Sequence, residues 1–263
     1  MGYKPLSELI SLKGKRALIT GAAMGIGKAI AFRFAEAGAD LELIDINIEK
    51  LVEVREELSR YEVEVNIHRV DLANKSEIDE LWSRVGDIDI LVNNAGIYVF
   101  RDTLEIDEDF FEKVMKINLY SVLWMCQHMI RRRLGKGGVI INVASIEAIM
   151  PFAKNLVHYD VSKIGVIGLT RTLAREYSGK GFRINALVPG GIETEGVKKL
   201  RKKAIMGLRI DMIKTAYDFK TRLPLGRFGE PDEVARVALF LASDLSTYIT
   251  GALIPVDGGF LSA

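Results

Sequence analysis

Short apolar runs rich in β-branched residues alternate along the chain with segments whose apolar residues recur at helical spacing. Residues 25–38 and 48–61 show the helical pattern clearly, and the second segment carries charges on its exposed face. The runs that we expect to form strands are residues 16–20, 40–45, 64–71, 89–94, 139–145, 183–189 and 252–257. Because strands that alternate with helices usually lie parallel, this rhythm predicts an α/β fold, a doubly wound parallel seven-stranded sheet with helices on both faces.

No internal repeat, low-complexity tract or linker-like stretch interrupts this rhythm, so we expect a single domain over residues 1–263. The rhythm breaks once, at about residues 195–224, which have a helical pattern and many charges. An insertion after the sixth strand would overhang the carboxyl edge of the sheet, where open α/β sheets bind ligands. We therefore predict a helical substrate lid at about 195–224.

Composition and charge exclude several function classes. The chain has 36 lysines and arginines against 35 aspartates and glutamates, a formal net charge of +1, so it offers no overall field for nucleic acid or a membrane surface. Residues 1–16 lack the apolar core of a signal peptide, and no run approaches the about 18 apolar residues of a membrane span, so we expect a cytoplasmic protein. The single cysteine, Cys126, excludes an intrachain disulfide, and without Cys/His clusters we predict no metal.

Tyr159 and Lys163 stand four positions apart at the head of a segment with a helical pattern. Residues with this spacing share a helix face, so the two head groups can lean into one space. A nearby ammonium favours the ionised phenol, and we expect Lys163 to lower the pKa of Tyr159 toward neutrality, which suits proton exchange with an alcohol or carbonyl. The spacing alone fits an exposed surface pair as well or better, so the surrounding motifs have to decide.

Glycines fill the turn between the first strand and the first long helix. Gly21, Gly25 and Gly27 allow a tight turn and a close backbone approach where a dinucleotide pyrophosphate meets helix N-terminal amides, and Met24 and Ile26 belong to the same loop. The spacing G-x-x-x-G-x-G departs from the G-x-G-x-x-G fingerprint and would also suit an ordinary turn. Its position directly after a strand favours a Rossmann-type dinucleotide site.

The end of the second strand bears on the choice of dinucleotide. Asp45 can accept hydrogen bonds from both ribose hydroxyls and would repel a 2′-phosphate. Neither Met24 nor Ile46 offers the cation that a 2′-phosphate requires, so we predict NAD as the cofactor, with NADP less favoured. The alternative is that Asp45 only caps the helix that begins near Asn47.

Two further strand ends are expected to meet the adenosine. After the third strand, Asp71 and the Leu72 amide can reach an adenine edge, although Asp71 could instead cap the helix that follows. The backbone after the fourth strand is also expected to run close to adenosine, at Asn94, Ala95 and Gly96. For Asn93 we expect a different role, which is to brace neighbouring strands.

Six segments, in order along the chain, resemble the motifs of the classical short-chain dehydrogenase/reductase family: TGAAMGIG, NNAG, KINLYS, NVAS, YDVSK and PGGIET. The resemblance covers about residues 12–260, and six ordered motifs rarely coincide. It implies an enzyme that interconverts a secondary alcohol and a carbonyl by hydride transfer with NAD(P). It also implies a homotetramer in which helices near residues 107–134 and 157–179 pack between subunits.

The resemblance implies a role for each matching residue. Tyr159 resembles the catalytic acid and base, and Lys163 the residue that lowers its pKa and holds the nicotinamide ribose. Ser145 resembles the hydroxyl that orients the substrate oxygen, and Asn118 the residue that holds a water for proton relay. A segment after the sixth strand resembles the family segment that holds the carboxamide and pyrophosphate, and it contains Pro189, Gly190, Ile192 and Thr194. The alternative is that this segment forms a plain turn.

The stretch between Ser145 and Tyr159 is expected to form a wall of the substrate pocket, with Glu147 and Asn155 as further substrate-binding residues. Its polar groups suit a sugar or polyol, and LVHY, which ends at Tyr159, resembles the sugar dehydrogenase branch of the family. These side chains could equally face solvent or a neighbouring subunit. The stretch carries one residue more than is usual in the family, which leaves the role of Ser145 open.

Two other functions stay open. The lid is rich in Lys and Arg between residues 198 and 209, which suits a solvated helix or else an anionic substrate, such as an acyl group on an acidic carrier protein. The alternative is therefore a 3-oxoacyl-acyl-carrier-protein reductase or a general carbonyl reductase, with residues 131–133 and Lys180 as further basic surface, although such carrier reductases generally use NADPH. A third class is a sensor that binds a dinucleotide without turnover. The presence of a matching residue at every catalytic position argues against this class.

Overall fold

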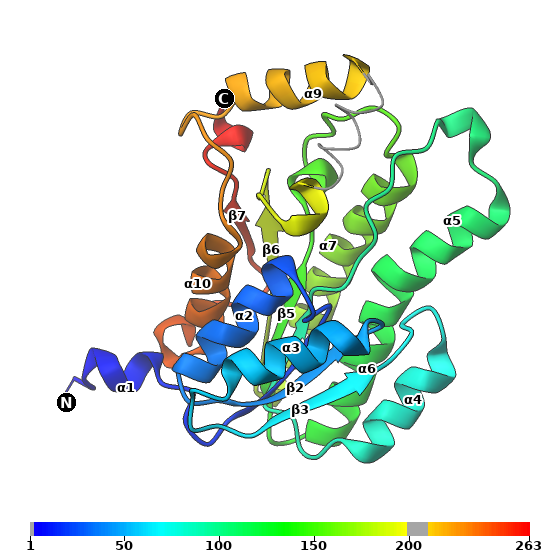
Figure 1. Ribbon diagram of the computed structural model, residues 1–263. Helices are drawn as coiled ribbons and strands as arrows, with labels where there is room; N and C mark the ends of the chain where they lie inside the picture. Colours follow the sequence, from blue (N-terminus) through cyan, green and yellow to red (C-terminus); the bar gives the residue numbers. More distant parts are fainter. Residues whose placement is uncertain (1–2, 199–209) are drawn as a thin grey trace.

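The computed structural model describes residues 3–198 and 210–263, whose strands form one parallel sheet (Figure 1). The strand order is β3-β2-β1-β4-β5-β6-β7, and every neighbouring pair is parallel. The strands are β1 (Arg16–Thr20), β2 (Asp40–Asp45), β3 (Val65–Arg69), β4 (Ile90–Asn93), β5 (Gly138–Val143), β6 (Phe182–Pro189) and β7 (Leu253–Val256). The predicted α/β fold, a Rossmann-type doubly wound parallel seven-stranded sheet, is confirmed.

Three helices cover one face of the sheet, where their apolar residues share a core cluster with those of the strands. They are α2 (Gly25–Glu36), α3 (Ile48–Leu58) and α10 (Pro231–Ala242). Both predicted helical segments, 25–38 and 48–61, correspond to helices of this layer. A shorter helix, α1 (Leu6–Ile10), extends from the body near the N-terminus (Figure 1).

The other face of the sheet has a second core cluster and its own helices. They are α4 (Lys75–Arg84), α5 (Glu108–Met115), α6 (Ser121–Arg133) and α7 (Val157–Tyr177). A single turn of π-helix, η2 (Lys116–Tyr120), joins α5 to α6. Because both faces are covered, the five inner strands are largely buried, which explains why most of them appear in the sequence as nearly continuous apolar runs.

Two strands end two residues earlier than the sequence pattern predicts. β3 stops at Arg69, and the Asp71 amide donates to Glu77 Oε2 at 2.8 Å instead of continuing the sheet. β5 stops at Val143, because Ser145 begins the 3₁₀ turn η3 (Ile146–Ala148). In both places a side-chain hydrogen bond turns the chain at the carboxyl edge of the sheet.

Asn93 and Asn142 are opposite each other in β4 and β5 and join the two strands through their side chains. Asn93 Nδ2 donates to Asn142 Oδ1 at 2.8 Å, and Asn142 Nδ2 donates to Thr170 Oγ1 on α7 at 2.9 Å. The prediction that Asn93 braces neighbouring strands is confirmed. Cys126 lies in the same buried network, where burial raises the pKa of its thiol to about 12.

The region expected to form a lid contains α9 (Ile210–Thr221), which lies beyond the carboxyl ends of β6 and β7 (Figure 1). Phe219 of α9 stacks on Phe260 at 4.6 Å and on Phe228 at 5.6 Å between ring centroids. This aromatic cluster fixes the C-terminal half of α9 to the body of the protein. The basic residues of the lid that lie outside the described residues are Lys199, Arg201, Lys202, Lys203 and Arg209.

Candidate active site

The four residues with proposed catalytic roles meet at the carboxyl edge of the sheet. Ser145 follows β5, Tyr159 and Lys163 lie in the first turns of α7, and Asn118 lies in the π-helical turn η2. Parallel strands bring their carboxyl ends to one edge, so residues far apart in sequence become neighbours. The fold thus assembles this group from three separate segments.

Lys163 is buried and fixed at the centre of this group. Its Nζ donates to the carbonyl of Val143 at 2.8 Å and lies 5.8 Å from the ring centroid of Tyr159. Gly96 makes room for it, because a Cβ at that position would lie 3.4 Å from Lys163 Nζ and 3.3 Å from Asn118 Oδ1. Burial lowers the pKa of Lys163 to about 8.

Tyr159 differs from the sequence-based expectation. Burial raises the pKa of its phenol to about 12, while a hydrogen bond with Ser145 lowers it and the charges of Glu147 and Asp160 raise it further. The prediction that Lys163 brings this pKa toward neutrality is therefore wrong for the protein chain by itself, because burial has the larger effect. The shared helix face, in contrast, is as predicted.

Asn118 ties α7 to the loop that follows β4. Its Oδ1 accepts from the Ile97 amide at 2.8 Å, and its Nδ2 donates to the Ile97 carbonyl and to Ser162 Oγ, both at 3.1 Å. π-helical turns often occur at functional sites, where they re-aim one side chain. Here η2 turns the buried Asn118 amide toward the site, whereas its role in holding a water stays a prediction.

Ser145 remains beside Tyr159 although the connecting stretch is one residue longer than usual. Its Oγ accepts from the Glu147 amide at 3.2 Å, which starts η3. In the loop that follows, Asn155 has a φ of 66° and its carbonyl accepts from the Arg101 amide at 3.0 Å. Positive φ is uncommon for a residue other than glycine, and asparagine tolerates it best.

The glycine loop needs glycine at the positions singled out in the sequence. Gly21 and Gly25 have φ of 66° and 58°, and a Cβ on Gly27 would lie 2.1 Å from the carbonyl oxygen of Gly21. Within the described residues no side chain caps the first turn of α2, which begins after Met24. Its free amides and positive helix end suit a pyrophosphate, so the loop fits a dinucleotide.

The glycine loop is held in shape from β4. Asn94 Nδ2 donates to the carbonyls of Thr20 and Gly21 at 3.0 and 3.1 Å. In return, Thr20 Oγ1 accepts from the amides of Asn94 and Ala95, both at 3.0 Å. The segment NNAG therefore supports the loop, which gives the Asn94 side chain a structural function next to the expected adenosine contact.

Asp45 bridges the end of β2 and the glycine loop. Its Oδ2 accepts from the Ala23 amide at 3.2 Å and its Oδ1 from the Asn47 amide at 3.0 Å, while Ile46 beside it is 57% exposed. The cap of α3 is the side chain of Asn47, so Asp45 does not have that role. The carboxylate stays at the mouth of the expected ribose site.

Asp71 and Leu72 lie at the neighbouring strand end. Asp71 Oδ1 accepts from the Ala73 amide at 2.9 Å, and Leu72 is buried. Asn74, and not Asp71, caps α4 with its side chain. This leaves the expected contact with adenine as a prediction.

The segment after β6 folds back over the glycine loop. β6 ends at Pro189, and Ile192 forms a parallel bridge with Gly229. A Cβ on Gly25 would lie 3.2 Å from Thr194 Cγ2, so the two segments almost touch. The residues expected to hold the carboxamide and pyrophosphate therefore face the loop expected to bind the same cofactor.

Comparisons with known proteins agree with this arrangement. A family model described as enoyl-(acyl carrier protein) reductase matches residues 21–261. Over 262 residues the chain is 42% identical to a 3-oxoacyl-[acyl-carrier-protein] reductase of Thermotoga maritima, an alignment that covers 95% of this chain and 99% of that protein. The chain belongs to the short-chain dehydrogenase/reductase family, and its relatives in this family are oxidoreductases.

Relatives of this short-chain dehydrogenase/reductase differ in their substrates. The chain is 37% identical over 257 residues to D-threitol dehydrogenase of Mycolicibacterium smegmatis, and the alignment covers 95% of this chain and 94% of that protein. The chain is also similar to a solved structure of an Agrobacterium tumefaciens protein with bound NADP, whose proposed activity is that of a 2-deoxy-D-gluconate 3-dehydrogenase. The TM-score is 0.86 at 33% identity, and 97% of this chain and 99% of that chain are covered.

Tyr98 is a residue of the short-chain dehydrogenase/reductase site that sequence reasoning missed. Its ring meets that of Tyr159 edge-on, with 4.9 Å between centroids and an angle of 85°, and burial raises the pKa of its phenol. Tyr98 stands two residues after NNAG, and this position just beyond a strand end was the sequence signal that could have placed it near the site. Which ring it touches depends on the packing of the loop against α7, which local sequence does not reveal.

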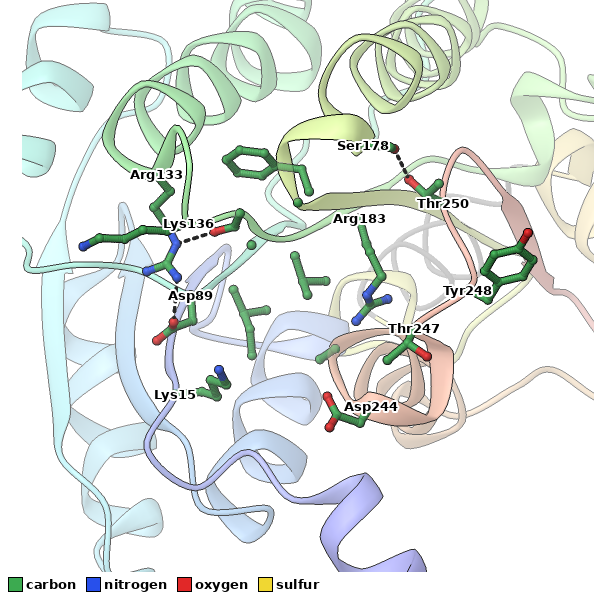
Figure 2. A pocket seen from close by; sticks show the side chains of 17 residues that line it. Lys15, Asp89, Arg133, Lys136, Ser178, Arg183, Asp244, Thr247, Tyr248 and Thr250 are labelled. Atoms are coloured by element: carbon green, nitrogen blue, oxygen red, sulfur yellow. Dashed lines mark hydrogen bonds and ion pairs between the residues drawn. The ribbon is translucent and has the colours of Figure 1, made fainter. Parts of the chain in front are cut away.

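A pocket of about 720 Å³ lies at the opposite, amino edge of the sheet (Figure 2). Arg133 in its wall pairs with Asp87 at 2.9 Å and with Asp89 at 3.0 Å. Nearby, Arg132 donates to the carbonyl of Val85 at 2.8 Å. The basic residues 131–133, expected as extra surface for an acidic carrier, thus lie near the starts of the strands, at the far end of the sheet from Tyr159.

Among the described residues 3–198 and 210–263, no helix is both long and apolar enough to cross a membrane. Within the same ranges no three His, Cys, Asp or Glu side chains gather in a way that could hold a metal ion.

Proposed function

We propose that this short-chain dehydrogenase/reductase catalyses NAD-linked oxidation of a secondary alcohol in a sugar or polyol, and the reverse reduction. The observation that carries the proposal is the carboxylate of Asp45 beside the exposed Ile46, at the same sheet edge as Ser145, Tyr159 and Lys163. A carboxylate here favours a ribose with free hydroxyls over one with a 2′-phosphate. The uncapped start of α2 supports a site for the pyrophosphate.

The proposed mechanism uses an acid and base, a hydroxyl and a buried ammonium. When bound, oxidised NAD supplies the hydride acceptor and a positive charge near the phenol. Tyr159, as phenolate, takes the proton of the substrate hydroxyl, and in the reverse direction its phenol returns that proton. Ser145 donates to the substrate oxygen as charge develops on it, and Lys163 favours the phenolate when it is protonated.

The proposal for the substrate rests on the wall between Ser145 and Tyr159 and on the relatives. Glu147 was expected to bind substrate, but its buried carboxylate accepts from the amides of Phe152 and Ala153. The polar group of this wall that carries the proposal is therefore Asn155, and D-threitol dehydrogenase is a relative of similar length. Phe219 of α9 meets Phe152 of this wall with 5.5 Å between ring centroids, and this contact would limit the size of the substrate. We infer a short polyhydroxylated substrate.

The second candidate is a 3-oxoacyl-acyl-carrier-protein reductase, or a more general carbonyl reductase. It is favoured by the Thermotoga maritima relative, which is 42% identical. Against it, Arg132 and Arg133 point to structural partners at the amino edge, and Asp45 disfavours the NADPH that such reductases generally use. Because the similar Agrobacterium tumefaciens structure contains NADP, the experiment has to compare NAD with NADP.

The first experiment measures initial rates of NADH and NADPH formation with a panel of aldoses, polyols, secondary alcohols and hydroxy acids. The proposal predicts NAD-linked oxidation of at least one sugar or polyol. Activity only in reverse, with NADPH and an oxoacyl thioester, would instead establish the second candidate. Tight dinucleotide binding without turnover of any substrate would favour a sensor.

We also propose that the protein is a homotetramer. Val157, Val161 and Ile164 form an apolar stripe along α7, with exposures of 46%, 44% and 50%. Such a stripe suits a helix that packs between subunits. Sedimentation analysis of the purified protein tests the assembly, and replacement of Val161 by Lys should reduce it to smaller species.

A further inference from the structure

Glu147 is a buried carboxylate placed two residues after Ser145. Glu147 is only 6% exposed, and its Oε2 accepts from the Phe152 amide at 2.8 Å. Its Oε1 accepts from the Ala153 amide at 3.3 Å. Burial of a charge is costly unless hydrogen bonds compensate it, so a carboxylate retained here has a structural or chemical use.

The two amides that Glu147 holds belong to the loop that carries the extra residue. The ring of Phe152 in this loop meets Phe219 of α9 and Phe260, with 5.5 Å between centroids in both cases. The guanidinium of Arg222, which directly follows α9, lies over that ring at 5.2 Å from its centroid. Glu147 thus connects the reactive serine to the aromatic cluster that anchors the lid.

Glu147 is also connected to the reactive phenol through Ser145, whose Oγ accepts from the Glu147 amide at 3.2 Å and is hydrogen-bonded to Tyr159. The charge of Glu147 is one of the causes that raise the pKa of Tyr159 and of Tyr98, and burial and this charge together raise the pKa of Asp160 to about 6. A negative charge near a phenol favours the neutral form. The carboxylate therefore works in the direction opposite to Lys163.

We propose that Glu147 is a positioning residue, which holds residues 152 and 153 beside Ser145 and sets, by its negative charge, how readily Tyr159 gives up its proton. This inference rests on the proposed function and extends it. Lys163 favours the phenolate needed to oxidise an alcohol, and Glu147 favours the phenol needed to reduce a carbonyl. The balance of the two charges defines the pH range in which each direction is fast.

The groups that act on Tyr159 come from three segments of the chain. They are Lys163 and Asp160 on α7, Glu147 and Ser145 at the turn after β5, and Tyr98 in the loop after β4. Among them, Asp160 is the second acid, and its Oδ1 is buried without a hydrogen-bond partner in the described part of the chain. A test of Glu147 must therefore separate its charge from that of Asp160.

The test compares the pH dependence of kcat/KM for alcohol oxidation in the wild type and in Glu147→Gln. Glutamine keeps the shape and removes the charge, so we expect the rising limb of the profile to move to lower pH by about one unit, as one charge at short range can produce. The same shift is expected with every alcohol, because it arises at Tyr159 and not in a substrate contact. A limb that keeps its wild-type position would overturn the proposal.

Two variants serve as matched controls for the charge. Glu233→Gln removes another carboxylate that accepts a backbone amide, from Glu230 at 2.8 Å, and it is expected to leave the limb unchanged. Asp160→Asn removes the second acid and is expected to produce a separate, smaller shift. A shift in Asp160→Asn without one in Glu147→Gln would assign the effect to Asp160 and reject the proposal for Glu147.

Glu147→Asp tests the positioning part and serves if the glutamine variant fails to fold. Aspartate keeps the charge near the phenol but is too short to hold both amides, so we expect an unchanged limb and a kcat lowered by about tenfold. A wild-type kcat in this variant would show that the hydrogen bonds to residues 152 and 153 do not support turnover.

A measurement without turnover separates this inference from the proposed function. Tyrosine labelled with ¹³C at Cζ reports ionisation of each phenol by NMR, and the Tyr159→Phe variant identifies the signal of Tyr159 in the NAD-bound protein. If no substrate is turned over but this signal titrates at lower pH in Glu147→Gln, the proposed function fails and the inference stands. If substrates are oxidised and the signal does not move, the inference fails alone.

Discussion

Lys163 Nζ donates to the backbone carbonyl of Val143, the last residue of β5, at 2.8 Å. This bond ties the first turns of α7 to the strand that leads to Ser145. The lysine therefore has a structural partner in addition to the proposed chemistry. It is also fully buried, so the protein holds an ammonium where burial disfavours the charge.

The stability of the protein should reflect this burial of Lys163. Its pKa falls from 10.5 to about 8 on folding, so between these values the unfolded chain binds more protons and stability rises with pH. The unfolding free energy of the wild type relative to Lys163→Met should therefore increase by about 2–3 kcal/mol from pH 7.5 to pH 10.5. Urea titrations of both proteins at the two pH values measure this difference, and a constant difference would contradict the assignment.

Tyr159→Phe should separate binding from chemistry. The variant keeps the ring that packs against Tyr98 and loses the hydroxyl that exchanges the proton. We expect an unchanged melting temperature within a few degrees, retained NAD binding, and a kcat lowered by about 10²–10⁴-fold or more. Near-normal turnover would remove Tyr159 from the mechanism.

Asp45→Asn should weaken the preference for NAD. Asparagine can still accept one backbone amide at the end of β2 but no longer repels a 2′-phosphate. We expect the ratio of kcat/KM for NAD to that for NADP to fall by about tenfold to a hundredfold, which corresponds to about 1.4–2.7 kcal/mol. Asp40→Asn, at the opposite end of the same strand, is the control and should leave the ratio unchanged.

Gly27→Ala should destabilise the protein although it lies in a helix, where alanine is normally favoured by about 1 kcal/mol. Its Cβ would lie 2.1 Å from the Gly21 carbonyl oxygen, so the glycine loop has to move. We expect a loss of about 3 kcal/mol or more and loss of dinucleotide binding. At Gly86 a Cβ would meet no described atom within 4 Å, so Gly86→Ala should change stability by about 0.5 kcal/mol or less.

The sequence predicts best those features that depend on local rules. All seven strands and the glycine turn follow from runs of apolar residues and from positions that need positive φ or a close approach. The bracing role of Asn93 was also predicted, because a polar side chain in a buried strand needs a hydrogen-bond partner, whereas its partner Asn142 was identified only in the structure. These features require no knowledge of how the layers pack.

The features that sequence reasoning missed depend on contacts between distant segments. The contact of Tyr98 with Tyr159 requires the loop after β4 to pack on α7, and the side-chain bonds of Asn118 to Ile97 and Ser162 join the same two segments. The pKa of Tyr159 was predicted with the wrong sign for the protein alone. The spacing to Lys163 is visible in the sequence, whereas the burial that outweighs it is a property of the folded protein.

The hydrogen bonds between Asn94 and Thr20 have a consequence for protein engineering. The glycine loop takes its shape from the end of β4 as much as from its own glycines, since Asn94 holds the carbonyls of Thr20 and Gly21. A graft of TGAAMGIG into another parallel sheet would therefore transfer the glycines without the scaffold that orients them. The smallest transplantable unit is the pair of adjacent strand ends, with Thr20 on one and Asn94 on the other.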